Sequence, residues 1–107
     1  MTRYGQIIEV KPGKLDGYKQ LHAAVWPAVL ATITACNIRN YSIFYRDGYL
    51  FAYFEYHGAD FEADMAKMAA DPVTQQWWAE CKPCQQPVAT ADPGEWWAGM
   101  EEIFHAE

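Results

Sequence analysis

Residues 38–56 read IRNYSIFYRDGYLFAYFEY, and this stretch decides the fold. In the run 38–46, side chains that alternate along an extended strand place Tyr41, Ile43 and Tyr45 on one face. Asp47-Gly48 follows this run and is a strong signal for a tight hairpin turn. The run 49–56 is almost wholly apolar or aromatic, which is typical of a strand covered on both faces. The stretch therefore predicts two antiparallel strands joined by a short turn.

The residues before this hairpin predict a strand and a broken helix. Residues 3–11 contain the apolar side chains of a strand, which Pro12-Gly13 would end. From Lys14 onward, apolar residues recur at helical spacing. Pro27 does not fit inside a continuous helix, so it should open a second helical segment or mark a kink. Asn37 suits the left-handed position at the end of that segment.

The residues after the hairpin repeat this pattern. An amphipathic helix is predicted over residues 59–70, and Asp71-Pro72 should end it and cap the next helix. The Pro-rich residues 82–94 predict a loop, and residues 95–104 a last strand. The resulting order, β-α-β-β-α-β, predicts one α+β domain over residues 1–107. Its fold would be the ferredoxin-like split βαβ arrangement, an antiparallel sheet with helices on one face.

Composition narrows the possible partners. The chain has 107 residues and a net charge of −6, and its 8 Lys and Arg residues are scattered, which argues against a nucleic-acid-binding surface. No apolar run approaches the ~20 residues that span a bilayer, so no membrane association is expected. No targeting segment is visible at the N-terminus, and we expect a cytoplasmic protein. A strongly apolar sheet with helices on one face would leave a large patch uncovered, which predicts a homodimer.

The three cysteines fit a reducing compartment, since an odd number cannot all pair. Cys81 and Cys84 have the C-x-x-C spacing of redox sites, but they follow a predicted helix rather than a strand. A zinc site would need a second pair of ligands, and only Cys36 and three histidines remain. We therefore expect two structural thiols at a helix end, with no metal and no cofactor.

Tyr18 and His22 are the strongest functional signal in the chain. They lie one helical turn apart, so their side chains meet on one face. Histidine titrates near neutral pH and is the natural general acid or base. Tyr41 and the pair Trp77-Trp78 add polar phenols and flat apolar faces. Together these residues predict a small neutral ligand whose protons are moved.

Adjacent tryptophans differ in expected role. Neighbouring helical residues point about 100° apart, so we expect one of Trp77 and Trp78 to contact the ligand and the other to pack. Trp96 and Trp97, placed in the last strand, should point to opposite faces and serve core and dimer contacts.

Several of these motifs occur together in one known family. The sequence resembles the L-rhamnose mutarotases, small dimeric α/β-barrel proteins of the ferredoxin-like type. The match extends over essentially the whole chain and rests on Tyr18, His22, Trp26-Pro27, Asn40-Tyr41-Ser42-Ile43, Trp77-Trp78 and Met100-Glu101-Glu102-Ile103-Phe104. The resemblance implies an enzyme that interconverts the α and β anomers of a 6-deoxy sugar without a cofactor. It also implies that His22 is the proton donor and that Tyr18, Tyr41, Trp77 and Trp78 contact the sugar.

The chemistry of mutarotation agrees with these residues. Opening the hemiacetal ring needs a proton at the ring oxygen and removal of one from the anomeric hydroxyl, which general acid–base catalysis can supply. A carboxylate, a tyrosine or a water could take the second proton, and Glu9, Glu55 and Glu101 are candidates. The sugar could be L-rhamnose, L-fucose or another aldose. Two other functions fit the same residues, a cofactor-free monooxygenase of the dimeric α/β-barrel superfamily and a non-catalytic small-ligand binding module.

Overall fold

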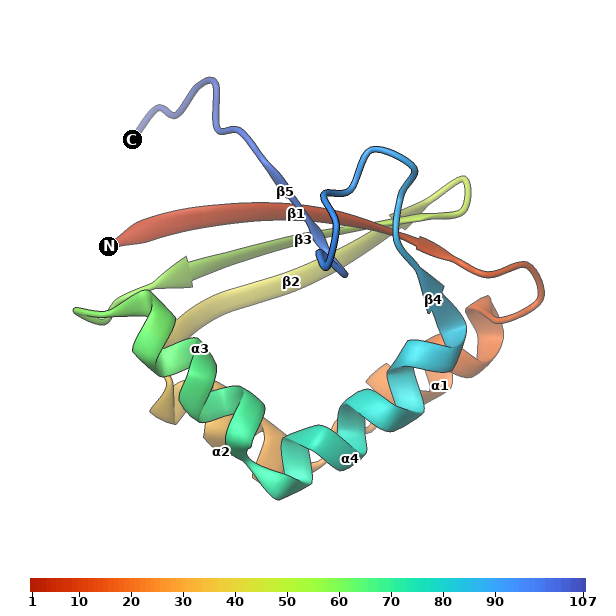
Figure 1. The fold of residues 1–107 in the computed structure, drawn as a ribbon, viewed down its shortest axis with the longest axis horizontal. Helices are drawn as coiled ribbons and strands as arrows, with labels where there is room; N and C mark the ends of the chain where they lie inside the picture. Colours follow the sequence, from red (N-terminus) through yellow and green to blue (C-terminus); the bar gives the residue numbers. More distant parts are fainter.

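A twisted antiparallel sheet forms one layer of the protein, and four α-helices form a second layer on one side of it (Figure 1). The computed structural model describes all 107 residues. In chain order the elements are β1 (Thr2–Val10), α1 (Leu15–Ala23), α2 (Pro27–Ala35), β2 (Ile38–Arg46), β3 (Tyr49–Tyr56), α3 (Phe61–Ala70), α4 (Pro72–Cys81), the 3₁₀ turn η1 (Lys82–Cys84), β4 (Gln85–Gln86) and β5 (Ala98–Met100). None of the helices is long and apolar enough to cross a membrane.

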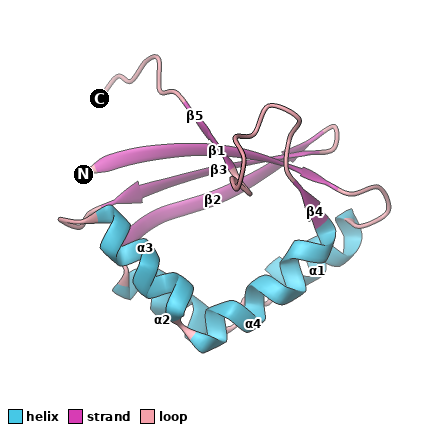
Figure 2. Cartoon of the chain, viewed as in Figure 1, coloured by secondary structure: helices cyan, strands magenta, loops and turns pink.

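The sheet has the predicted split βαβ order, β2-β3-β1-β4. β3 lies between β1 and β2 and is antiparallel to both, so the two helices α1 and α2 carry the chain across it. The other edge of β1 is shared, with β4 pairing at Glu9 and Val10 and β5 pairing at residues 5–7. Figure 2 shows the strands as one layer and the helices below them. The α+β fold class predicted from the sequence is confirmed.

The hairpin turn has the geometry that its sequence predicts. Asp47 and Gly48 both have positive φ, 51° and 87°, as a two-residue turn of type I′ requires. Arg46 and Tyr49 pair directly across it. The twist of this turn matches the twist of the strands, which is why Asp-Gly fixes the register here.

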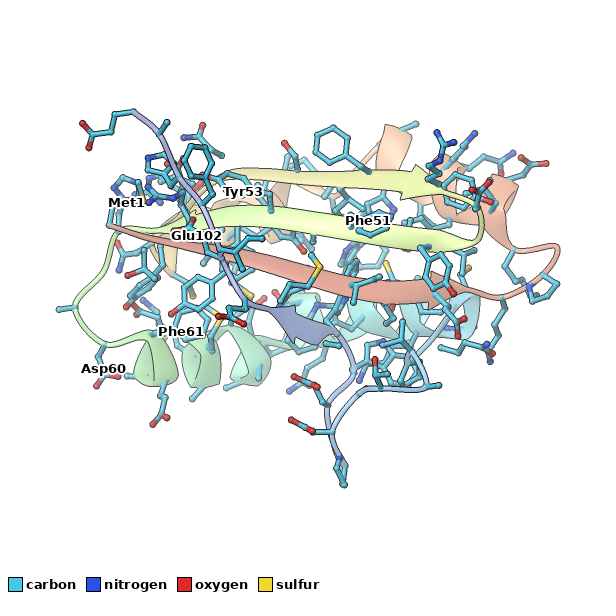
Figure 3. All side chains as sticks on the ribbon, turned by 90° about the horizontal axis from the view of Figure 1, so that it is seen from above. Met1, Phe51, Tyr53, Asp60, Phe61 and Glu102 are labelled. Carbon is cyan, nitrogen blue, oxygen red and sulfur yellow. The ribbon has the colours of Figure 1, made fainter.

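Coverage of the sheet is one-sided, which corrects the prediction that β3 is covered on both faces. Leu50 and Phe54 of β3 point toward the helices and are buried. Phe51 and Tyr53 lie on the opposite face and are only half-buried (Figure 3). The strand is apolar on both sides, but all four helices of the chain lie on the same side. Within one chain, only the C-terminal tail approaches the outer face of the hairpin, where Tyr53 and Phe104 line the same hollow.

Two prolines break the helical layer at the predicted places. Trp26 is extended before Pro27 begins α2, and Asp71 is extended before Pro72 begins α4. The Asp71 carboxylate caps α4 by accepting from the backbone N–H of Thr74 at 2.9 Å. As a result α3 and α4 meet at an angle and form a V below the sheet (Figure 1). Thr32 of α2 also approaches this cap, with its Oγ1 3.4 Å from Asp71 Oδ2.

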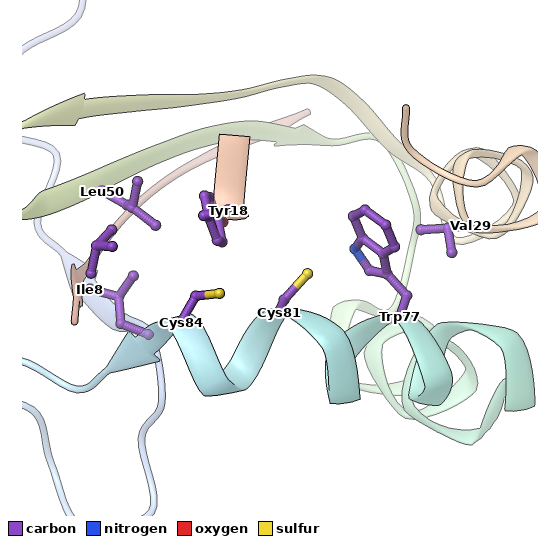
Figure 4. Close-up of a cluster of buried hydrophobic side chains, with 8 residues drawn as sticks. Ile8, Tyr18, Val29, Leu50, Trp77, Cys81 and Cys84 are labelled. Atoms are coloured by element: carbon purple, nitrogen blue, oxygen red, sulfur yellow. The ribbon is translucent and has the colours of Figure 1, made fainter. Parts of the chain in front are cut away.

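The core between the layers is built by residues from distant parts of the chain. Figure 4 shows Ile8 and Leu50 of the sheet opposite Cys81 and Trp77 of α4, with Tyr18 of α1 between them. A second, smaller cluster joins Ile38, Phe54 and Tyr56 to the half-buried side chains of α3, namely Phe61, Met65 and Met68. These α3 residues face inward as the amphipathic pattern predicts.

A β-bulge in β2 changes which side chains face the helices. Arg39 pairs with Glu55 and Ser42 with Tyr53, so two residues of β2 stand opposite one residue of β3. Asn40 adopts a positive φ of 52° at this point, and its amide donates to Glu55 at 2.8 Å. Ile38 and Tyr41 are three residues apart and would face opposite sides of a regular strand. The bulge lets both face the helical layer.

The C-terminal region differs most from the sequence prediction. The predicted last strand, residues 95–104, is reduced to β5, and residues 101–107 have no regular structure. Ile103 and Phe104 are 88% and 81% exposed, because the chain leaves the edge of β1 after Met100. The predicted loop 82–94 instead begins with the turn η1 and the short strand β4. Arg3 holds the tail to the sheet through an ion pair with Glu102 at 2.8 Å.

The Glu55 carboxylate at the bulge should make the stability of the fold depend on pH. Hydrogen bonds from Asn40, Tyr53 and His57 lower the pKa of Glu55 to about 2. A lowered carboxylate pKa stabilises the fold above its ordinary value of 4.5, and this contribution is lost as the pH falls toward 2. We expect Glu55→Gln to lower the free energy of unfolding at pH 7 and to remove much of the further loss at pH 3. Urea unfolding at both pH values measures this.

Glu107→Gln, at the exposed C-terminus, is the matched control and should leave the acid dependence unchanged. Equal acid sensitivity of the wild type and Glu55→Gln would contradict the role given to Glu55.

Candidate functional site

A cavity of about 420 Å³ lies between the sheet and the helical layer. All five residues proposed from the sequence line it, namely Tyr18, His22, Tyr41, Trp77 and Trp78. They come from α1, β2 and α4, so the fold brings together side chains that are up to 60 positions apart in the sequence. The predicted site residues therefore line one cavity.

The cavity has a polar part and an apolar part. The polar part is lined by α1, η1 and β4 and contains Tyr18, His22, Lys82 and Gln85. The apolar part lies toward α2 and α3, and its walls are Ile33, Ile38, Phe54, Phe61, Met65 and Met68. A cavity that is largely apolar with a few polar groups is the usual form of a small-molecule site.

His22 is fixed by its own helix. Its Nδ1 lies 2.9 Å from the backbone carbonyl oxygen of Tyr18, one turn earlier. A carbonyl oxygen only accepts, so Nδ1 carries a proton and donates it. The neutral ring then has its lone pair on Nε2, and the imidazolium has a proton there. Nε2 is thus the nitrogen that can exchange a proton with a ligand.

Aromatic rings also hold the His22 imidazole in place. The Tyr18 ring stacks on it with centroids 4.1 Å apart, and Trp77 meets it edge-on at 5.3 Å. Trp26 in turn lies against Trp77 at 5.2 Å. Trp26 therefore supports the His22 imidazole indirectly, through the buried indole of Trp77.

The two cavity phenols remain protonated near neutral pH. Burial raises the pKa of Tyr18 well above its usual range, and nearby Tyr41 adds to this effect. Tyr41 is 42% exposed as a residue, but removal of its hydroxyl from water raises the pKa to about 12. A protonated phenol can donate and accept hydrogen bonds, but it is a poor proton acceptor in catalysis.

Both tryptophans of the Trp77-Trp78 pair line the cavity, and the expectation that one contacts the ligand while the other packs stays a prediction. Trp77 is 6% exposed and belongs to the core, whereas Trp78 is half-buried. The ammonium of Lys82 lies 5.9 Å from the Trp78 ring and 5.7 Å from the Trp96 ring. Because the indoles are large, one can reach the cavity from the core and the other from its rim.

The sequence prediction missed several polar and aromatic cavity residues, among them Gln6, Lys82, Gln85, Trp96 and Trp97. Trp96 and Trp97 were expected to contact the core and the dimer partner; both do pack against the core, and both also line the cavity. They precede β5 in irregular backbone, so the strand alternation assumed for them does not apply. Gln85 follows the C-x-x-C segment in a region where no periodicity marks the inward side. Only the composition of this region, rich in tryptophan, could have signalled a role.

The carboxylates proposed as the second proton carrier lie elsewhere. Glu9 accepts a hydrogen bond from Gln86 at 3.1 Å, and Glu55 accepts one from Asn40 at the bulge. Glu101 lines a separate hollow beside Arg3 and the C-terminal tail. None of the three lines the cavity with His22. His22 and Lys82 are the only basic side chains that line the cavity, and no carboxylate lines it.

The cysteines are buried and free, as expected for structural thiols. Burial, with further effects from Cys84 and Glu80, raises the pKa of Cys81 to about 12. A thiol in this state is a weak nucleophile and a weak ligand. Figure 4 shows Cys81 and Cys84 inside the core between α4 and the sheet.

Comparison with known proteins identifies relatives over the full length of the chain. The family model described as L-rhamnose mutarotase matches residues 3–106. An L-rhamnose mutarotase from Oceanobacillus iheyensis is 32% identical, with 100% of both chains covered. The L-rhamnose mutarotase of Shouchella clausii is 33% identical over 98% of each chain.

Two solved structures share the fold. The crystal structure of an L-rhamnose mutarotase from Formosa agariphila has a TM-score of 0.80 at 22% identity and covers all of both chains. Tetracenomycin F2 cyclase from Streptomyces glaucescens, a type-II polyketide cyclase, has a TM-score of 0.72 at 12% identity, covering 100% of this chain and 98% of the cyclase. At these identities the likeness concerns the fold alone.

The two adjacent tryptophans should respond differently to truncation. Trp77→Ala removes a buried ring that supports His22, and we expect it to cost about 3–5 kcal/mol of stability. Trp78→Ala removes a half-buried ring at the rim, so its main effect should be weaker sugar binding. Urea unfolding and sugar titration of both variants measure the difference. An equal loss of stability in the two variants would refute this division.

Proposed function

The chain belongs to the L-rhamnose mutarotase family and is an isomerase, and we propose that it interconverts the α and β anomers of L-rhamnose in the cavity around His22. The observation that carries this proposal is the fixed imidazole of His22 in a cavity with two phenols and several indole faces. Indole and phenol rings offer apolar faces to the C–H side of a sugar, and phenol hydroxyls offer hydrogen bonds to its hydroxyls.

In the proposed step, His22 as imidazolium gives its Nε2 proton to the ring oxygen of the sugar. The bond between the anomeric carbon and the ring oxygen breaks as the anomeric hydroxyl loses its proton and becomes a carbonyl. Rotation about the adjacent carbon–carbon bond presents the other carbonyl face, and the ring closes by the reverse transfers. The reaction is redox-neutral, and His22 ends in the form in which it began.

A water molecule is the proposed acceptor of the anomeric proton. The three candidate glutamates lie outside the cavity, and the raised pKa values of Tyr18 and Tyr41 (about 12 for Tyr41) disfavour a phenolate near neutral pH. His22 is then the single acid–base side chain of the reaction. Lys82 carries the only permanent charge at the cavity wall and would favour developing negative charge on the sugar.

The apolar part of the cavity supports a 6-deoxy sugar. A methyl group at carbon 6 would lie against apolar side chains such as Met65 and Phe61 at little cost, whereas a hydroxymethyl group would lose its hydrogen bonds to water there. We therefore propose that the 6-deoxy sugars L-rhamnose and L-fucose are better substrates than glucose, and the family supports L-rhamnose as the preferred one of the two.

We also propose that the protein acts as a homodimer. The outer sheet face carries the exposed side chains Phe44 and Tyr49, and the tail carries Ile103 and Phe104, an arrangement that monomers rarely leave exposed to water. A second copy packed on this face would bury both features in a two-fold interface. The odd number of cysteines, all free, supports a reducing compartment, and we propose the cytoplasm.

His22→Ala should lower the enzymatic rate of anomer exchange by about 10²–10⁴-fold, because the acid–base group is lost. NMR saturation transfer on L-rhamnose, L-fucose and glucose measures the rates. His105→Gln, at the exposed C-terminus outside the cavity, is the matched control and should keep wild-type activity. No acceleration of any sugar by the wild type would reject the proposed reaction, and an active His22→Ala variant would reject its acid.

The dimer can be tested by analytical ultracentrifugation. The wild type should sediment with twice the chain mass of 12.2 kDa. Replacing both Ile103 and Phe104 with Asp should shift the protein toward the monomer, because it places charge on the proposed interface. A wild type that remains monomeric at micromolar concentration would refute the proposal.

A further inference from the structure

The Tyr18 hydroxyl is hydrogen-bonded to Gln85, which is in turn hydrogen-bonded to Trp96. Gln85 Nε2 is 3.3 Å from the Tyr18 hydroxyl oxygen, and Trp96 Nε1 is 2.9 Å from Gln85 Oε1. The three residues come from β4, the segment before β5, and α1, so this contact chain forms only in the folded protein. All three side chains line the cavity.

The chemistry of Trp96 fixes the direction of every hydrogen bond in this chain. An indole N–H can only donate, so the Gln85 atom beside it must be the carbonyl oxygen. The other end of the amide is then its NH₂ group, which donates to Tyr18. The Tyr18 oxygen accepts this hydrogen bond, and its own proton must point away from Gln85.

The arrangement is locked by burial. Gln85 is 4% exposed, and every buried polar side-chain atom of the chain has a partner. Turning the amide over would place its NH₂ group against the indole N–H and leave a buried donor without an acceptor, which is costly. No acceptor in the chain receives the Tyr18 proton. The space that remains for that proton is the cavity.

We propose that Gln85 and Trp96 are positioning residues that hold the Tyr18 hydroxyl as an obligatory hydrogen-bond donor to an oxygen of the bound sugar. This inference rests on the proposed function and deepens it, since it assigns a polarity to the contact. A sugar hydroxyl or ring oxygen that faces Tyr18 must accept. The raised pKa of Tyr18 agrees, because a buried phenol that stays protonated keeps its proton for donation.

Reversing the polarity of Gln85 tests the proposal. Gln85→Glu keeps the side-chain shape but offers an acceptor to both Trp96 and Tyr18, so the phenol would donate to the new carboxylate instead of the sugar. We expect kcat/KM for L-rhamnose anomer exchange to fall about 3- to 10-fold, close to the loss in Tyr18→Phe, since each removes one hydrogen bond. Gln85→Met creates no acceptor and should lose less than Gln85→Glu.

A second, uncharged variant guards against failure to fold. Trp96→Phe keeps the aromatic face beside Lys82 but removes the N–H, so the Gln85 amide can turn and accept from Tyr18. We expect a loss of about 2- to 5-fold. Each change is repeated in the Tyr18→Phe background, where it should alter kcat/KM less than about twofold because the donor is already absent.

The pattern across the two backgrounds decides the outcome. Losses from Gln85→Glu and Trp96→Phe that occur only when Tyr18 is present support the positioning role. Equal losses in both backgrounds would show that these residues act by packing, and no loss with Tyr18 present would show that its polarity is irrelevant, so either result overturns the inference. A wild type without any activity would reject the proposed function itself, and the inference with it.

Discussion

The two proline breaks in the helical layer are the constraint on which the cavity depends. Pro27 and Pro72 each force an extended residue between two helices, so neither helical segment continues straight across the sheet. The Asp71 carboxylate caps α4 and lies within reach of Thr32 on α2, which brings the two breaks together. The helices therefore form a V under a sheet that stays extended above it (Figure 1). Side chains from all four helices can then line one space without filling it.

The chemistry of the cavity follows from a few local contacts and one β-bulge. The i, i+4 spacing in α1 stacks Tyr18 on His22, and the backbone carbonyl of Tyr18 fixes the imidazole proton on Nδ1. The bulge at Asn40 turns both Ile38 and Tyr41 inward, so β2 contributes an apolar wall and a phenol to the same cavity. Trp77 joins the core to the site, since it packs against Trp26 on one side and His22 on the other. Stability and the proposed function therefore rely on the same aromatic ring.

The sequence predicts what local signals encode. Asp47-Gly48, Pro27 and Asp71-Pro72 act through their own backbone preferences, and the structure has a turn or a helix start at each of them. Helical spacing and a family resemblance marked the five proposed site residues, and all five line the cavity. Trp96 and Trp97 were missed as cavity residues because irregular backbone has no periodicity to show which way a side chain points, and Gln85 because β4 is only two residues long. The last strand was predicted too long because apolar residues at 103–104 suggest pairing, whereas the chain leaves the edge of β1 after Met100.

The proposed reaction depends on one nitrogen atom, Nε2 of His22, and ¹⁵N NMR of the histidine rings observes it directly. When the His22 imidazole is neutral, Nδ1 should carry the proton and Nε2 should resonate as an unprotonated nitrogen. Addition of L-rhamnose should shift the Nε2 resonance and leave Nδ1 nearly unchanged, because only Nε2 is free to contact the sugar. A neutral ring protonated on Nε2, or a sugar-induced shift confined to His57 or His105, would contradict the assignment of His22 as the group that moves the proton.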